Sequence, residues 1–217
     1  TAAHDATLPG RDRSESPLRF VTAASLFDGH DAAINIVRRL LQSNGAEVIH
    51  LGHNRSVADI VRAALQEDAD GIACSSYQGG HNEYFRYMVD MLGERGARHV
   101  RVVVGGGGTI SPDEAAALEA HGVEKIYTPD DGMRMGLDGM IEDVFQRVRA
   151  WGEPEWTFDV PLAGDHLAIG RCLTLLEEAA DDPAVLADFR SAWRQLPGAA
   201  PVLGITGTGG AGKSSLT

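Results

Sequence analysis

Cysteine, basic residues and long apolar runs are all scarce in this chain of 217 residues. Its two cysteines, Cys74 and Cys172, cannot build a disulfide framework and suit a reducing compartment. The 19 Lys and Arg against 31 Asp and Glu give a formal net charge of -12, which excludes the basic groove that nucleic acids require. No run is long enough to cross a bilayer, and no secretory signal is evident. We expect an acidic cytoplasmic protein without a nucleic-acid or membrane partner.

Apolar β-rich runs alternate with amphipathic helical patterns through the first two thirds of the chain. The pattern predicts strands at 20–27, 46–51, 70–75, 100–104 and 124–127, each followed by a helix. The first helix is expected to bury one face made by Ala33, Ile36, Val37 and Leu40, and the last is marked by side chains that include Met133, Leu137, Met140 and Ile141. Five such alternations predict an α/β fold with a doubly wound, five-stranded parallel sheet of the flavodoxin or Rossmann type.

Breaks in the pattern divide the chain into four predicted parts. Residues 1–19 form a flexible leader without periodicity, and residues 20–150 form the α/β domain. Residues 151–200 carry two helices without an intervening strand and are predicted to be a helical linker. Residues 201–217 begin with a new strand and open a second domain.

The second domain opens on a phosphate-binding pattern. The run from Gly207 to Ser214 fits G-x-x-x-x-G-K-[ST] directly after a β-rich stretch. Backbone N–H groups of such a loop approach phosphate oxygens, its lysine reaches the terminal phosphates, and Ser214 is the expected magnesium ligand. The candidate nucleotide-binding residues are Gly207, Gly209, Gly210, Ala211, Gly212, Lys213, Ser214 and Ser215. The helix and the acidic residue that complete such a site would follow Thr217, so we expect these residues to belong to a longer protein. We expect that the 217-residue chain alone does not hydrolyse nucleotide.

Three loops are expected to meet at the carboxyl edge of the first sheet, where ligands of doubly wound folds bind. They are Asp28-Gly29-His30 after the first strand, the run from Ser75 to His81 after the third, and Gly105 to Gly108 after the fourth. His30 is a candidate metal ligand, and Asp28 could fix its tautomer. The glycines leave room for a large flat or elongated ligand, to which Ser75 can donate a hydrogen bond.

The other histidines do not join His30 in a recognisable zinc pattern. His50, His53 and His81 are interpreted as surface or loop residues, with His81 able to face a ligand. A phosphoacceptor response domain shares the sheet order, yet it needs an acidic pair, an aspartate and a lysine at strand ends that here carry Phe27-Asp28, Ser75 and Tyr127-Thr128. Flavodoxin-like flavin binding does not call for the histidine.

These motifs resemble the signature of cobalamin-binding domains. The pattern Asp28-x-His30-x-x-Ala33, Ser75-x-Tyr77 and the Gly105 to Gly108 tract is similar to D-x-H-x-x-G, S-x-L and G-G, with Ala33 in place of glycine and Tyr77 in place of leucine. The resemblance covers residues 20–150. The longer strings at 28–35 and 76–84 are similar to the fused isobutyryl-CoA mutases, a branch of the adenosylcobalamin-dependent acyl-CoA mutases. There a helical linker, a P-loop GTPase chaperone domain and a substrate barrel follow the cobalamin domain, which agrees with the order here.

The resemblance implies a base-off cofactor with His30 as the lower axial ligand of cobalt and Asp28 orienting it. The implied cofactor-binding residues are Asp28, Gly29, His30, Asp31, Ser75, Tyr77, Gly79, Gly105, Gly106, Gly107, Gly108, Thr109, Tyr127 and Pro129, with Val37 and Thr128 as weaker candidates.

For the full-length protein the resemblance implies a radical isomerase that interconverts isobutyryl-CoA and n-butyryl-CoA. It further implies binding of GTP and Mg²⁺, GTPase activity and a homodimer, while this part alone binds cofactor without catalysing the isomerisation. Two alternatives stay open from the sequence: a cobalamin module of a methyltransferase or sensor, and a cobalt-free domain like a response regulator.

Overall fold

A five-stranded sheet forms the centre of the computed structural model, which describes residues 16–106, 108–151 and 164–194. Its strands are β1 (Arg19–Ser25), β2 (Glu47–Arg55), β3 (Gly71–Ser75), β4 (Arg101–Gly105) and β5 (Lys125–Tyr127). Every neighbouring pair is parallel, and the order across the sheet is β2-β1-β3-β4-β5. The predicted five-stranded parallel sheet is therefore confirmed.

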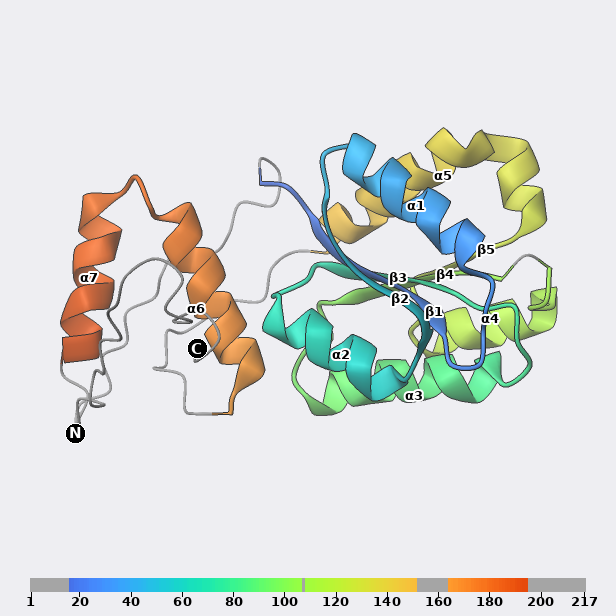
Figure 1. The fold of residues 1–217 in the computed structure, drawn as a ribbon, viewed down its shortest axis with the longest axis horizontal. Coiled ribbons are helices and arrows are strands. Elements are labelled where there is room, and N and C mark those ends of the chain that lie inside the picture. The colour runs from blue at the N-terminus through green and yellow to red at the C-terminus, as the bar shows by residue number, and fades with distance from the viewer. Residues whose placement is uncertain (1–15, 107, 152–163, 195–217) are drawn as a thin grey trace, which may run out of the picture.

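Helices cover both faces of this sheet (Figure 1). On one face lie α1 (Asp31–Ser43) and α5 (Pro129–Ala150), and on the other lie α2 (Val57–Gln66), α3 (His81–Glu94) and α4 (Pro112–His121). Each layer closes over its own apolar cluster. Because α1 and α3 leave the adjacent strands β1 and β3 toward opposite faces, the winding of the chain changes direction between these two strands.

Two helices begin where local sequence directs them to begin. The Ser56 side chain accepts from the backbone N–H of Asp59, which caps α2. At α4, the side chain of Ser111 accepts from the N–H of Glu114 while the Glu114 carboxylate accepts from the N–H of Ser111. That backbone hydrogen bond is the main cause that lowers the pKa of Glu114 to about 2.

Four side chains lie differently from the sequence expectation. Strand β1 ends at Ser25, because Phe27 turns into the left-handed region at φ 64° and its N–H donates to the Asn54 side chain. Ile36 is half exposed, and the buried positions of α1 are instead Ile34 and Leu41. Met133 and Leu137 belong to α5 but are exposed, and between them Gly136 at φ 69° interrupts the helical path.

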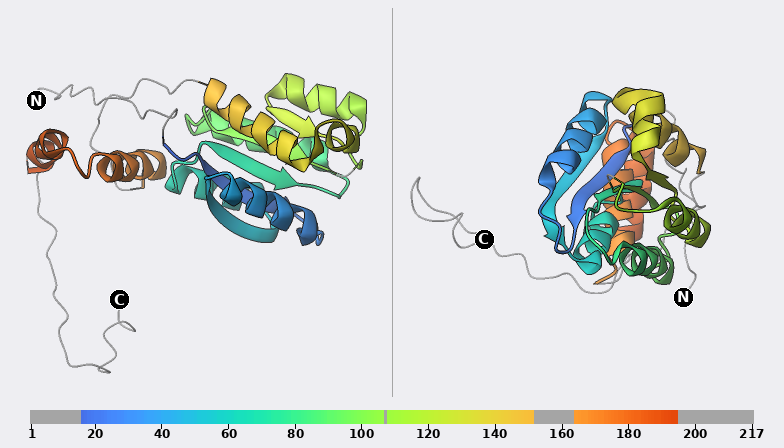
Figure 2. Two further views of the ribbon diagram at one scale, coloured as in Figure 1. Left: turned by 90° about the horizontal axis from the view of Figure 1, so that it is seen from above. Right: turned by 90° about the vertical axis from the view of Figure 1, so that its right-hand side faces the viewer.

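Beyond the amino ends of the strands lie α6 (His166–Glu178) and α7 (Pro183–Arg194), as Figure 2 shows. Helix α6 packs closely on the end of α2. A Cβ atom at Gly170 would come within 2.7 Å of the Leu65 and Gln66 carbonyl oxygens, so only glycine permits this approach. Beside it, the buried Arg171 guanidinium lies 3.2 Å from the buried Asp68 carboxylate.

Several predictions fall on parts of the chain outside the described residues. These are residues 1–15 of the leader, Gly107, the stretch 152–163, and the strand and phosphate loop within 201–217. The predicted domain boundaries accordingly stay predictions. Within the described ranges, no helix is long and apolar enough to cross a membrane.

The Arg171–Asp68 pair generates a stability prediction. We expect Arg171→Met to lower the hydrogen-exchange protection of α6 amides by about a hundredfold, or about 3 kcal/mol, because it leaves a buried carboxylate without its ion-pair partner. Arg134→Met is the matched control, since the Arg134–Asp131 pair is exposed on the arginine side and should contribute below about 1 kcal/mol. Equal protection of α6 in both variants would show that the buried pair does not hold the helix.

Candidate functional site

One carboxylate connects the loops at the carboxyl edge of the sheet. Asp28 Oδ1 accepts from the backbone N–H of His30 at 2.8 Å, and Asp28 Oδ2 accepts from the backbone N–H of Tyr77 at 2.8 Å. The Ser76 N–H donates to the Gly105 carbonyl at 2.9 Å. The loops after β1, β3 and β4 are thus linked to one another, so the structure brings together the three segments that the sequence singled out.

The same carboxylate orients the His30 side chain. Asp28 Oδ1 lies 2.9 Å from His30 Nδ1, and Asp28 is 1% exposed whereas the His30 side chain is 67% exposed. An ionised carboxylate can only accept, so the proton of this hydrogen bond belongs to Nδ1. In the neutral ring this leaves the lone pair on His30 Nε2, which is the arrangement of a metal-ligating imidazole supported by a carboxylate.

A narrow apolar pocket, here called the tail slot, opens between α1, the ends of β3 and β4, and the start of α5. It has a volume of about 370 Å³. The buried Ser75 hydroxyl is at its wall and has no hydrogen-bond partner among the described residues. A Cβ atom at Gly105 would meet nothing within 4 Å, so the absent side chain adds to the open space. The slot is therefore shaped for a mostly apolar ligand with one polar group.

The predicted cofactor residues divide into those inside the slot and those around it. Ser75, Tyr77, Gly105, Gly106, Tyr127 and Pro129 line it, together with the weaker candidates Val37 and Thr128. Gly29 and Asp31 are exposed at the start of α1, and Gly108 and Thr109 are exposed beyond β4. Gly79 lines a different pocket, described below.

Sequence reasoning missed several walls of the slot, among them Ile34, Ala73, Val103, Gly132 and Met140. These are apolar or small residues on elements that also build the core. Their residue types carry no signal that separates a pocket wall from a core contact. Ile36 shows the converse case: the sequence pattern predicted a core contact, whereas the side chain is half exposed and lines the slot.

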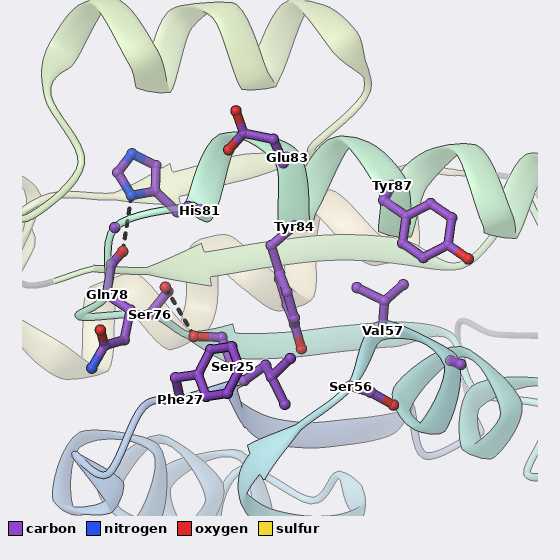
Figure 3. Close-up of a pocket in the computed structure, with 14 residues that line it drawn as sticks. Ser25, Phe27, Ser56, Val57, Ser76, Gln78, His81, Glu83, Tyr84 and Tyr87 are labelled. Carbon is purple, nitrogen blue, oxygen red and sulfur yellow. Dashed lines mark hydrogen bonds between the residues drawn. The ribbon is translucent and has the colours of Figure 1, made fainter.

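A second pocket, here called the aromatic groove, lies on the other face of the sheet (Figure 3). It has a volume of about 560 Å³ and runs between the β1 loop, the start of α2 and α3. At its base the Ser25 hydroxyl donates to the Ser76 hydroxyl at 2.9 Å. His81 is buried at the start of α3, with Nδ1 3.1 Å from the Gln78 carbonyl, so its interpretation as a surface residue is wrong. Burial also raises the pKa of Tyr84 in this groove.

Burial keeps the Cys74 thiol and the Tyr127 hydroxyl in the slot wall protonated at neutral pH. Burial raises the pKa of Cys74, and burial together with the hydrogen bond to Asp143 at 2.8 Å raises the pKa of Tyr127. Across the described ranges, no group of three or more His, Cys, Asp or Glu side chains could hold a metal ion.

A doubly wound sheet with a carboxylate-held imidazole above an apolar slot is a ligand-binding α/β domain. The family described as the B12 binding domain matches residues 18–134. A 2-hydroxyisobutanoyl-CoA mutase small subunit of Aquincola tertiaricarbonis is 35% identical over 58% of this chain and 91% of its own length. The chain therefore belongs to the B12-binding domain family, as do small subunits of acyl-CoA mutases, and its cofactor is a cobalamin.

Longer relatives match the chain beyond this domain. A fused isobutyryl-CoA mutase of Cupriavidus metallidurans is 56% identical over the whole chain, which spans 20% of that protein. One of Geobacillus kaustophilus is 53% identical over 94% of the chain. A solved cobalamin-binding protein from Desulfitobacterium hafniense, 20% identical with a TM-score of 0.51, covers 60% of this chain and 59% of its own and shows the same fold.

The residues present fit a cobalamin on observations of this structure. An exposed imidazole has its free nitrogen directed away from the supporting carboxylate, and beside it lies an apolar slot with an unpartnered hydroxyl. The cobalt-free alternative is not favoured, since the family match covers the whole sheet.

Adjacent serines give a paired test of the slot. We expect Ser75→Ala to leave the free energy of unfolding of the cofactor-free chain unchanged or raised by about 1 kcal/mol, because it removes an unpartnered buried hydroxyl. Ser76→Ala should lower it by about 1 kcal/mol, because Ser25 loses its acceptor. Cobalamin binding should weaken in Ser75→Ala only. Urea unfolding measures the free energies and titration with cobalamin measures the binding. A Ser75→Ala variant less stable than Ser76→Ala would contradict the view that the Ser75 hydroxyl has no partner in the cofactor-free chain.

Proposed function

We propose that this domain binds adenosylcobalamin base-off, with His30 Nε2 as the lower axial ligand of cobalt and Asp28 holding the imidazole. The observation that carries the proposal is the contact of Asp28 Oδ1 with His30 Nδ1 at 2.9 Å, which leaves Nε2 free on an exposed ring. A buried carboxylate in this position also fixes the tautomer and the orientation of the imidazole, which favours the bond to a metal.

The cofactor's freed nucleotide tail would enter the tail slot. Ser75 would donate to a polar atom of the tail, while Tyr77, Gly105, Gly106, Tyr127 and Pro129 would contact its apolar surface. The proposed set is completed by Gly29, Asp31, Gly79, Gly108 and Thr109, and by Gly107, which lies outside the described residues.

For the longer protein we propose an adenosylcobalamin-dependent mutase that interconverts isobutyryl-CoA and n-butyryl-CoA. The 56% identity to a fused isobutyryl-CoA mutase over the whole chain supports this proposal. The cofactor would supply radical chemistry, and the acyl-CoA would bind to a part of the protein outside this chain. A methyltransferase module or a cobalamin sensor is less well supported, since the named relatives are mutases.

The remaining chain fits the same plan. We propose a leader at 1–19, the cobalamin domain at 20–150, a helical linker at 151–200 and the start of a G domain at 201–217, which would bind GTP and Mg²⁺ through Lys213 and Ser214. In the longer protein this G domain would act as a GTPase chaperone for cofactor loading, and the protein would work as a cytoplasmic homodimer.

Replacement of the proposed ligand tests the binding mode. We expect His30→Ala to weaken cobalamin binding by about 10- to 100-fold, because the bond to the metal is lost. His53→Ala is the control, since His53 is exposed on β2. With nitrogen-15 histidine in the wild-type chain, the electron paramagnetic resonance spectrum of the cobalt(II) complex should change from a nitrogen triplet to a doublet. A persistent triplet would mean that cobalt is bound by another nitrogen.

The mutase proposal needs the longer protein. Supplied with adenosylcobalamin, that protein should convert isobutyryl-CoA to n-butyryl-CoA, as followed by chromatography of the acyl groups, and the His30→Ala variant should lose most of this activity. Cobalamin binding without turnover of either acyl-CoA would retain the cofactor assignment and reject the substrate.

A further inference from the structure

We propose that the Tyr77 ring fixes the plane of the His30 imidazole and so sets the orientation in which Nε2 meets the metal. The two ring centroids lie 5.2 Å apart at an interplanar angle of 36°. This is the distance and tilt of a favourable contact between aromatic rings. The inference rests on the proposed function, because it concerns the same axial ligand, and it makes Tyr77 a positioning residue.

The Asp28 contact alone does not fix the imidazole plane. A single hydrogen bond fixes the position of Nδ1 but leaves the ring plane free to rotate about the line from Asp28 Oδ1 to His30 Nδ1. The His30 side chain is mostly exposed, so few neighbours restrain that tilt. Tyr77 restrains it because its ring faces the imidazole while its backbone N–H is tied to Asp28 Oδ2 at 2.8 Å. The imidazole and its stacking partner are therefore held by the two oxygens of one carboxylate.

Two other roles are open to a tyrosine at this place. Its ring lines the tail slot, so it could act only as an apolar wall, and its hydroxyl could bond to the ligand. Tyr77→Leu keeps an apolar wall but removes the ring, whereas Tyr77→Phe keeps the ring and removes the hydroxyl. Tyr87→Leu is a matched control, since Tyr87 lies in the aromatic groove on the other face of the sheet (Figure 3).

The experiment loads each variant of the 217-residue chain with cobalt(II) cobalamin. The dissociation constant and the resolved nitrogen splitting in the electron paramagnetic resonance spectrum are then compared. Tyr77→Leu should weaken binding by about two- to tenfold and broaden the nitrogen splitting, because the imidazole then samples a range of orientations. Tyr87→Leu should match the wild type in both measurements, and Tyr77→Phe should keep the nitrogen splitting as sharp as in the wild type, whatever its dissociation constant. Melting temperatures check that each variant is folded.

The outcomes separate this inference from the proposed function. If the wild-type splitting comes from His30 but Tyr77→Leu leaves the linewidth unchanged, the stacking role is rejected while axial ligation stands. If Tyr77→Phe broadens the splitting as much as Tyr77→Leu, the hydroxyl and not the ring is responsible, which also rejects the inference. If the wild type shows no histidine coupling at all, axial ligation fails and the inference fails with it.

Discussion

The site depends on the burial of one charge, the Asp28 carboxylate. A buried carboxylate is tolerated only when hydrogen bonds replace its water, and here the donors are the N–H groups of His30 and Tyr77 together with His30 Nδ1. These donors come from loops that belong to different strands. Because the Asp28 carboxylate must accept hydrogen bonds from both loops, it holds the loop after β1 against the loop after β3. The same hydrogen bonds place the His30 imidazole.

The sheet order explains why this happens between β1 and β3. At this point the chain leaves adjacent strands toward opposite faces, with α1 on one face of the sheet and α3 on the other. Small residues keep the adjoining space open, since Ala73 and Gly105 add little or no side chain to the slot. The unpartnered Ser75 hydroxyl disfavours the ligand-free fold, which is the expected cost of a pocket prepared for a polar group.

Local signals were enough to predict the elements of the sheet and its helices. Ser111, Pro112 and Glu114 place the start of α4, because a capping box involves only four consecutive residues. The positions of Asp28, Ser75 and the glycine tract at or just after predicted strand ends were also enough to predict that they lie at one edge of the sheet. The burial of His81 could not be predicted, because it depends on the approach of α4. The exposure of Ile36 and Met133 could not be predicted either, because isoleucine and methionine also occupy core positions and only the packing around each side chain separates the two cases.

Strand β1 connects two ends of the domain with different contacts: α6 lies at its amino end, and the loop with Asp28 follows its carboxyl end. At its amino end the Arg19 side chain donates to the Glu67 carbonyl at 2.8 Å and to the Thr174 hydroxyl of α6 at 3.1 Å. At its carboxyl end the chain enters the turn that carries Asp28. Between these ends β1 is buried and paired on both sides with parallel neighbours. The contacts of α6 with Arg19 and α2 therefore lie at the edge of the sheet opposite the imidazole.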